Sequence, residues 1–338
     1  MSSVRSQIAP AAKSLLFHAG GCAALRRLLP SHDVAILRYH AVCGDEGAAY
    51  ADPGISVSPE AFDRHIRYLA ANYTVLSLAE VVARLRGRQP LPGNTVAITF
   101  DDGYADNLEA ARTLNRYGVS ATFFIAAGCL VGGDPFWPAE IRSLVRALSE
   151  PVLTLDVAGS AVAIPVHDAT ARQAAVRRLT KLFKSNPVPV RESLRDQLRR
   201  AAGGARMPDC MLTWEQLAEM QRLGMTIGAH TLTHPNLPSA GLDTATREIV
   251  GSKDRLEREL GQPVTLFSYP NGGAERYYTP DLQRVVAASG FAAAATSHNA
   301  FAGPVSDLYA LERIEVEERI EDLVFALEVE RFAFKPAR

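Results

Sequence analysis

The chain alternates apolar, strand-like runs with amphipathic helical segments along most of its length. Runs such as Val34–His40, Thr95–Phe100 and Met225–Ala229 are separated by segments with apolar residues at helical spacing. Strands that alternate with helices favour parallel pairing, because each helix returns the chain to the edge where the next strand begins. About seven such units in 338 residues predict a closed or nearly closed (β/α) barrel. Its last strand is expected over ALERIEV (310–316), and Asp106, with Glu109 three residues on, is expected to cap the helix after Thr95–Phe100.

A segment of about residues 132–211 interrupts this alternation. It contains a Pro-rich entry, a short β-like stretch and two basic helices, over residues 134–138, 152–164, 169–184 and 190–202. Long connections in compact domains usually carry structure or function of their own, so we predict a mostly helical insertion that covers the barrel mouth. The predicted organisation is an N-terminal helical segment (1–31), a barrel (32–330) with the insertion, and a C-terminal tail (331–338).

Charge and cysteine content exclude several classes of partner. The 36 Lys and Arg residues balance 37 Asp and Glu residues, so nothing indicates a nucleic-acid partner. The four cysteines form no C-x-x-C pair and are expected to be reduced. The apolar stretch 13–30 is too short and too interrupted to span a bilayer, which favours a cytoplasmic amphipathic helix. Secretion and peripheral membrane contact are the alternatives, and the oligomeric state stays open.

Reactive side chains follow the proposed strands. Because the carboxyl ends of barrel strands meet at one face, we expect these residues to gather there. Two adjacent carboxylates disfavour each other's ionised form, so a site that keeps both usually manages a cation or a proton, although Asp-Gly is also ordinary turn chemistry. The residues are His40, Asp101, Asp102, His230, His234, Tyr269, Pro270 and His298.

The segment HTLTHP places two histidines four residues apart, a spacing that lets both grip one metal ion. One aspartate from another strand end completes a His₂-carboxylate set with an open position for water. Thr231 stands where a zincin would keep its general base, so the base comes from elsewhere. We therefore expect one of Asp101 and Asp102 to bind a divalent ion while its neighbour takes the proton.

Three motifs, TFDDG, HTLTHP and FSYPNGG, resemble the polysaccharide deacetylase family, carbohydrate esterase family 4. The resemblance covers about residues 34–330 without the insertion. It implies a distorted (β/α)₇ barrel and metal-dependent removal of N-acetyl groups from sugars, with Zn²⁺ favoured over Co²⁺, Ni²⁺ or Fe²⁺. By matching positions, it implies Asp101 as the base, the Tyr269 backbone N–H as an oxyanion donor, and three metal ligands, Asp102, His230 and His234.

Two departures from the family pattern bear on the site. Ser268 stands where the family usually carries an arginine that orients the base, and Arg313, at a late strand end, is the candidate to replace it. The family's late Leu-x-x-His acid has no clear match. LRYHAV resembles relatives that deacetylate exopolysaccharides and carry a Tyr-His pair on the first strand. His40 is therefore favoured as the general acid and is expected to face Asp101 across the metal, with His298 as the alternative.

The expected substrate is an acetylated amino-sugar oligomer or polymer of exopolysaccharide or cell-envelope type. Tyr104, Tyr269 and Pro270 are expected to contact the sugar, and the rings of Trp137, Tyr277 and Tyr278 are further candidates to stack on it. The alternatives are a cyclic-amide or ureido hydrolase on the same barrel and a non-catalytic glycan-binding protein, although a binding module has no need of both Asp and His pairs. The basic insertion helices, with Lys181 and Lys184, suit either an anionic polymer or a solvated face.

Overall fold

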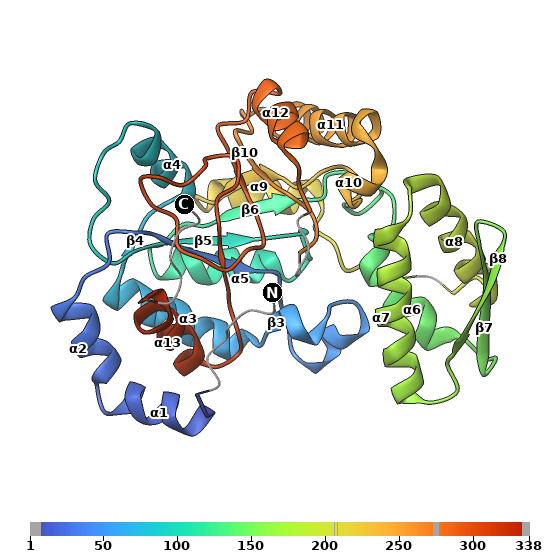
Figure 1. Cartoon of the computed structure of the whole chain (residues 1–338), viewed down its shortest axis with the longest axis horizontal. Helices are drawn as coiled ribbons and strands as arrows, with labels where there is room; N and C mark the ends of the chain where they lie inside the picture. Colours follow the sequence, from blue (N-terminus) through green and yellow to red (C-terminus); the bar gives the residue numbers. More distant parts are fainter. Residues whose placement is uncertain (1–7, 206, 208, 273–276, 333–338) are drawn as a thin grey trace.

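The computed structural model describes residues 8–205, 207, 209–272 and 277–332. Residues 1–7 of the predicted N-terminal segment, Gly273 of the FSYPNGG motif and residues 333–338 of the predicted tail lie outside this part. Figure 1 shows a central sheet surrounded by helices, with a smaller lobe at the right of the view.

A parallel sheet forms the centre of the molecule. Its strands are β1 (Ala35–Tyr39), β4 (Thr74–Val75), β5 (Thr95–Phe100), β6 (Thr122–Ile125), β9 (Thr226–Ala229), β10 (Leu266–Ser268), β11 (Ala293–Ala295) and β12 (Ile314–Glu315). They follow the order β11-β10-β9-β6-β5-β1-β12, and β4 pairs with β5 off this path. A parallel bridge between Ala295 and Leu311 joins β11 to the residues that lead into β12, so the sheet curls towards closure. The predicted (β/α) barrel is confirmed.

Helices cover the outside of the curled sheet. They are α3 (Pro59–Asn72), α4 (Leu78–Arg86), α5 (Asn107–Arg116), α9 (Trp214–Arg222), α10 (Leu237–Ala240), α11 (Leu242–Leu260), α12 (Pro280–Ala288) and α13 (Ile320–Glu328). Local sequence sets their starts: Ser58 caps α3 by accepting the Ala61 N–H, and Pro59 occupies the first turn. Shorter elements are β2 (Ala41–Val42), which pairs with β3 (Ser56–Val57), and the 3₁₀ turns η1 (Asp45–Ala49), η2 (Pro53–Ile55) and η3 (Glu330–Phe332).

The long strands are buried on both faces, as their continuous apolar sequence requires. Every residue of β1 and β5 is buried, and the rings of Phe100 and Phe123 stack with centroids 4.4 Å apart. The four cysteines are free and buried. A packed interior of this kind holds the strand ends in fixed positions, which is what a catalytic site needs.

The N-terminal stretch forms two helices where one was expected. Gly20, at φ +79°, separates α1 (Pro10–His18) from α2 (Gly21–Leu28), because a left-handed residue cannot continue an α-helix. Both helices lie beside α13 (Figure 1), and Lys13 Nζ is 3.0 Å from Asp322 Oδ1. None of the described helices has the length and apolar character needed to cross a membrane.

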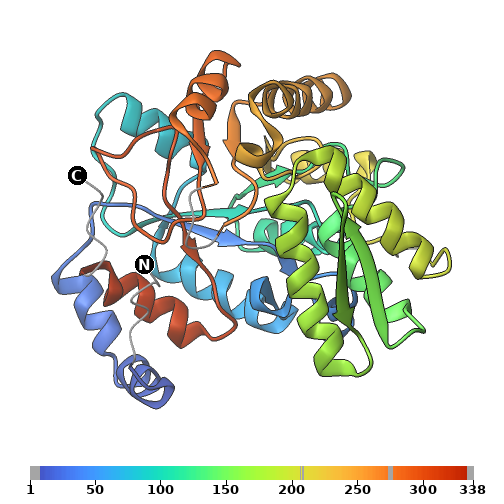
Figure 2. The same cartoon turned by 45° about the vertical axis from the view of Figure 1, so that its right-hand side comes forward.

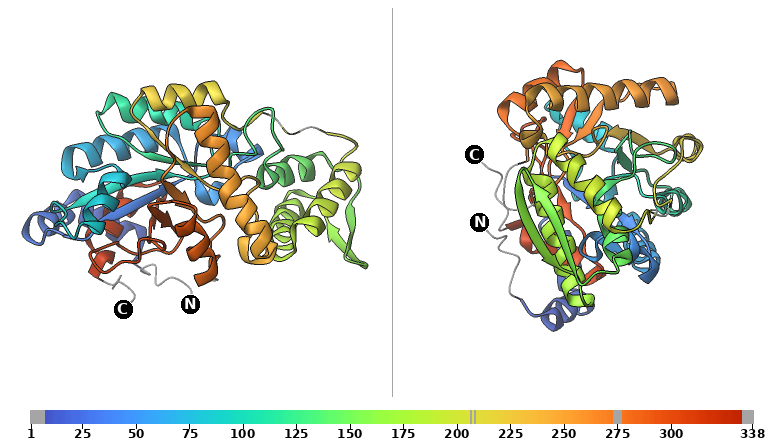
Figure 3. Two further views of the ribbon diagram at one scale, coloured as in Figure 1. Left: turned by 90° about the horizontal axis from the view of Figure 1, so that it is seen from above. Right: turned by 90° about the vertical axis from the view of Figure 1, so that its right-hand side faces the viewer.

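The lobe beside the barrel is the segment that interrupts the β-α alternation. It comprises α6 (Trp137–Ala147), β7 (Val152–Val157), β8 (Ser160–Pro165), α7 (Ala169–Ser185) and α8 (Val188–Ala201). β7 and β8 pair only with each other, as an antiparallel hairpin, and the lobe has its own apolar cluster around Leu144, Leu155 and Leu179. Figures 2 and 3 show it projecting from one end of the barrel.

Two local predictions are wrong. Asp106 was expected to cap α5, but its own backbone is helical and its carboxylate accepts the Val42 N–H and the Tyr50 hydroxyl. Those partners come from a distant segment, so tertiary contacts replace the local cap. The last strand was expected over ALERIEV, but only Ile314 and Glu315 are paired as a strand, alongside β1.

Candidate active site

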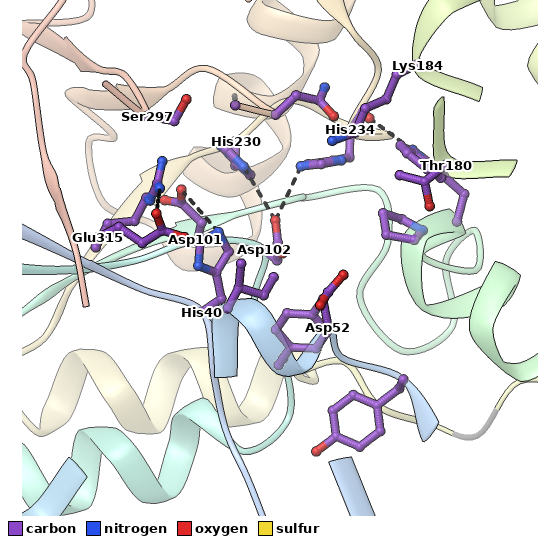
Figure 4. Close-up of a pocket in the computed structure, with 18 of the residues that line it drawn as sticks. His40, Asp52, Asp101, Asp102, Thr180, Lys184, His230, His234, Ser297 and Glu315 are labelled. Atoms are coloured by element: carbon purple, nitrogen blue, oxygen red, sulfur yellow. Dashed lines mark hydrogen bonds and ion pairs between the residues drawn. The ribbon is translucent and has the colours of Figure 1, made fainter. Parts of the chain in front are cut away.

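The carboxyl ends of the sheet strands form the floor of a cavity of about 760 Å³. Residues after β1, β5, β9 and β11 line it, and α6 and α7 of the insertion form one wall (Figure 4). The lining residues include His40, Asp101, Asp102, Tyr104, Trp137, Thr180, Lys184, His230, His234 and His298. Both helices belong to the segment that was predicted to cover the barrel mouth, so the residues at the strand ends meet a wall formed by the insertion.

Asp102, His230 and His234 converge at the bottom of this cavity. One ligand atom from each lies within 4.8 Å of the others, and all three residues are buried. Asp102 Oδ1 is 3.5 Å from His230 Nε2 and 3.3 Å from His234 Nε2. Burial raises the pKa of Asp102, but the two histidines more than offset this, so the carboxyl stays ionised. One carboxylate and two imidazoles suit a divalent metal ion with open coordination positions.

Neighbouring groups orient these side chains. His230 Nδ1 donates to the Ser268 carbonyl oxygen at 2.7 Å, which directs the Nε2 lone pair towards Asp102. Asp102 and His234 have φ angles of +77° and +55°, and Thr231 between the histidines has +67°. Left-handed backbone is costly for these residue types and persists where the surroundings enforce it. The strained backbone at these positions therefore orients the ligand side chains towards one another.

Arg313 is placed on Asp101. Its Nη1 and Nη2 donate to the two Asp101 carboxylate oxygens at 2.7 and 2.6 Å, and the guanidinium is fully buried. The remaining donors bond to the Thr99 hydroxyl, the Ser268 hydroxyl and the Thr296 carbonyl. Burial raises the pKa of Asp101, but Arg313 more than offsets this and holds the pKa well below its usual value. The small Ser268 leaves room for this guanidinium, which comes from the residue just before β12.

Replacing Arg313 with methionine is expected to destabilise the protein by about 3–5 kcal/mol, because it leaves a buried carboxylate without its partner. The pKa of Asp101 is lower in the folded protein than in the unfolded chain, where an aspartate has a pKa of about 3.9. The ionised carboxylate therefore stabilises the fold at pH values above about 3.9, and this stabilisation is lost as the pH falls through the folded-state pKa. Without Arg313 the pKa of Asp101 rises, so the acid limb of kcat/KM should move to higher pH by about 1–3 units. Denaturant unfolding and a pH–rate profile measure both effects.

Arg195→Met is the matched control for this prediction. Arg195 is also buried, and its Nε donates to Glu140 at 2.9 Å within the insertion, away from Asp101. Its loss should destabilise the protein without moving the acid limb. An unchanged acid limb in Arg313→Met would contradict the role assigned to Arg313.

His40 lies beside Asp101, and this corrects one expectation. It was expected to face Asp101 across the metal, but its Nε2 is 3.9 Å from Asp101 Oδ2. The sheet order explains the difference: β1 and β5 are neighbours, with Tyr39 opposite Phe100, so the residues that follow them are neighbours too. His298 also lines the cavity, from the segment after β11. Burial lowers the pKa of His40 to about 4, although Asp102 and Asp101 raise it.

The predicted sugar contacts divide into two groups. Tyr104 lines the cavity, although only 2% of its surface is exposed. Tyr269 and Pro270 are buried and are not among the lining residues, and the Tyr269 hydroxyl donates to the Tyr309 carbonyl. The Tyr269 N–H donates to the Ala295 carbonyl at 3.0 Å between β10 and β11. The structure therefore corrects the expected roles of Tyr269, since both its polar groups already have partners.

The insertion forms hydrogen bonds at three points with the HTLTHP loop and with Asn236, the residue that follows it. The Trp137 indole N–H donates to the His234 carbonyl at 2.9 Å, and Asn236 Nδ2 donates to the Lys184 carbonyl at 3.0 Å. Arg191 Nη2 donates to the Thr233 hydroxyl at 3.2 Å. The sequence suggested Trp137 only as a ring that stacks on sugar. Nothing in its local pattern indicates that this side chain supports a histidine about a hundred residues away.

Trp137→Phe is expected to weaken divalent metal binding about 10-fold, the lower end of the usual cost of losing an outer contact to a metal ligand. Phenylalanine keeps most of the buried ring but leaves the His234 carbonyl without its donor. Competition with a chromophoric chelator for Zn²⁺ measures the affinity. Trp214→Phe, on α9, is the control and should bind the ion like the unaltered protein. Equal affinities for the two variants would show that the indole contact does not position His234.

Comparisons with known proteins agree with this geometry. The polysaccharide deacetylase family model matches residues 88–149 and 162–294. A Bacillus subtilis (strain 168) protein provisionally named polysaccharide deacetylase YxkH is 22% identical over 297 residues, covering 87% of this chain and 75% of that protein.

Solved structures share the fold. Streptococcus pyogenes deacetylase PplD, in complex with acetate, superposes with a TM-score of 0.59 at 22% identity, over 91% of this chain and 100% of PplD. IcaB from Ammonifex degensii gives 0.57 at 17% identity, over 89% and 99%. Polysaccharide deacetylase BC0361 from Bacillus cereus gives 0.56 at 17% identity, over 87% and 69%. The family model covers more than half of the chain, which therefore belongs to the polysaccharide deacetylase family of enzymes.

Proposed function

We propose that this enzyme uses a divalent metal ion, Zn²⁺ in the first instance, to release acetate from N-acetylated amino sugars in a polysaccharide or a glycan intermediate. The observation that carries the proposal is the placement of an Asp/His/His cluster directly beside a second carboxylate that is held ionised by Arg313. The cavity above them has a volume of about 760 Å³. A bound ion would polarise the acetyl carbonyl and lower the pKa of its water.

The chain's own residues account for the proton transfers. Asp101 is ionised at neutral pH and can accept a proton from the attacking water. His40 Nε2, 3.9 Å from Asp101 Oδ2, is close enough to take up that proton after a small movement. His40 then donates the proton to the departing amine, so the water supplies both the hydroxyl of acetate and the amine proton.

Acetate release tests the proposal. Purified protein is assayed with N-acetylglucosamine oligomers, other acetylated amino-sugar oligomers and lipid-linked acetylated sugars, with bound metal measured in the same preparation. We expect acetate release that stops after chelation and returns with a divalent ion. Cyclic amides and ureides belong in the same panel. Turnover of those compounds alone, or turnover that survives complete removal of metal, would contradict the proposal.

A further inference from the structure

Helix α7 presents two polar side chains to the cavity. Thr180 and Lys184 are four residues apart, so they lie on one face of the helix, and both line the cavity. Figure 4 shows them reaching from α7 towards the side of the site that holds His234. Lys184 is half-buried, whereas Lys181, on the same helix, is exposed and lines no part of the cavity. Of these two lysines of α7, Lys181 is therefore exposed to solvent and Lys184 faces the active site.

Lys184 differs from the other cations around the cavity. Arg38 pairs with Glu315, whose carboxylate oxygen is 3.6 Å from Nη2, and Arg142 pairs with Asp52. Among the described lysines and arginines that line the cavity, Lys184 is the one without an ion pair. Its ammonium group lies 5.9 Å from the centroid of the Tyr277 ring. A partly buried charge without a counter-ion is costly, so the position of Lys184 suits an anionic group of a substrate.

The position of Lys184 is fixed relative to the metal ligands. Its backbone carbonyl accepts the Asn236 side-chain N–H at 3.0 Å, and Asn236 follows His234 by two residues. Phe183 next to it packs on Trp137, with ring centroids 5.7 Å apart, and Trp137 bonds to His234. Burial lowers the pKa of Lys184, while Asp102 and Asp52 raise it. The backbone of Lys184 is thus held beside the site by the same contacts that hold His234.

We propose that Lys184 binds a carboxylate or phosphate group on the acetylated glycan and so makes the enzyme selective for acidic glycans. The proposal rests on the deacetylation proposed above and names the substrate class for the same cavity. Asp101 is neutralised by Arg313, and Asp102 faces two histidines, so neither offers Lys184 an exclusive partner. A sugar acid or phosphate next to the acetylated sugar would meet the ammonium while the acetamido group lies over the Asp/His/His cluster.

The test compares kcat/KM for three substrates of similar length. One is neutral N-acetylglucosamine hexamer, one alternates N-acetylglucosamine with glucuronic acid, and one is an N-acetylglucosamine oligomer that carries phosphate esters. The unaltered enzyme is expected to prefer at least one acidic substrate, and the better one identifies the anion. Lys184→Gln should reduce the acidic-to-neutral ratio of kcat/KM by about 10- to 100-fold, the usual cost of losing a hydrogen bond to a charged group. Lys184→Arg should retain most of the ratio.

Lys181→Gln is the matched control, because it removes the same charge from an exposed position of the same helix and should leave the ratio unchanged. Calorimetric binding of the glucuronic acid oligomer gives a second measurement that needs no turnover, and Lys184→Gln should raise its Kd by a similar factor. If no substrate releases acetate but this binding depends on Lys184, the proposed reaction fails and the acidic-glycan site stands. Equal Kd values, or an equal ratio in Lys184→Gln and the unaltered enzyme, would overturn the inference.

Discussion

Asp101→Asn is expected to lower kcat by about 10²–10⁴-fold while the protein keeps its metal ion, since this is the usual contribution of a general base. Asparagine has nearly the same shape, so Arg313 can still donate to its amide oxygen. The amide cannot accept a proton at neutral pH, however. Acetate release under saturating substrate, together with metal content, measures the effect.

Asp102→Asn is the informative comparison. It alters the adjacent carboxylate, which faces the two histidines rather than Arg313. We expect this variant to lose metal, whereas Asp101→Asn should lose only turnover. If Asp101→Asn retained more than about a tenth of kcat, well above the range for a lost base, the assignment of Asp101 would be wrong.

His40→Ala is expected to reduce kcat by about 10²–10⁴-fold with little change in metal binding. The alanine removes the imidazole that lies beside Asp101 and closes the route by which the collected proton reaches the amine. Metal ligands should be unaffected, because the Asp102, His230 and His234 cluster does not include His40. The measurement is acetate release, with chelator competition as the readout for the ion.

His298→Ala tests the alternative acid. His298 lines the same cavity, but from the segment that follows β11, whereas His40 follows the strand next to Asp101. We expect a much smaller loss of kcat than for His40→Ala. If His298→Ala were inactive while His40→Ala kept normal activity, His298 rather than His40 would be the general acid.

The strand-end pattern predicted much of the site because parallel strands place their carboxyl ends at one edge whatever their order. The pattern therefore predicted that Asp101, Asp102 and His230 lie close together. Their relative sides depend on the order of strands, which the alternation does not encode. β1 lies next to β5, so His40 stands beside Asp101 rather than opposite it.

The sequence did not predict the hydrogen-bond partner of the Tyr269 N–H or the face of α7 that packs on the barrel, because both depend on contacts between distant segments. The sequence shows Tyr269 in a motif, but only the pairing of β10 with β11 shows that its N–H is already used by Ala295. A basic helix likewise gives the spacing of Lys181 and Lys184 but not which face meets the barrel. That choice is made by packing between segments far apart in sequence, which no local pattern records.

The contacts between the insertion and the HTLTHP loop limit how this enzyme could be re-engineered. An insertion taken from a relative would bring a different cavity wall. It would also have to reproduce the hydrogen bonds that Trp137, the Lys184 carbonyl and Arg191 form with that loop and with Asn236. A transplant that ignored them would deprive a backbone already turned to positive φ at His234 of its support. Substrate range and metal retention are therefore linked in this molecule, whereas single side chains of the insertion that line the cavity, such as Thr180 and Lys184, can change without loss of these backbone contacts.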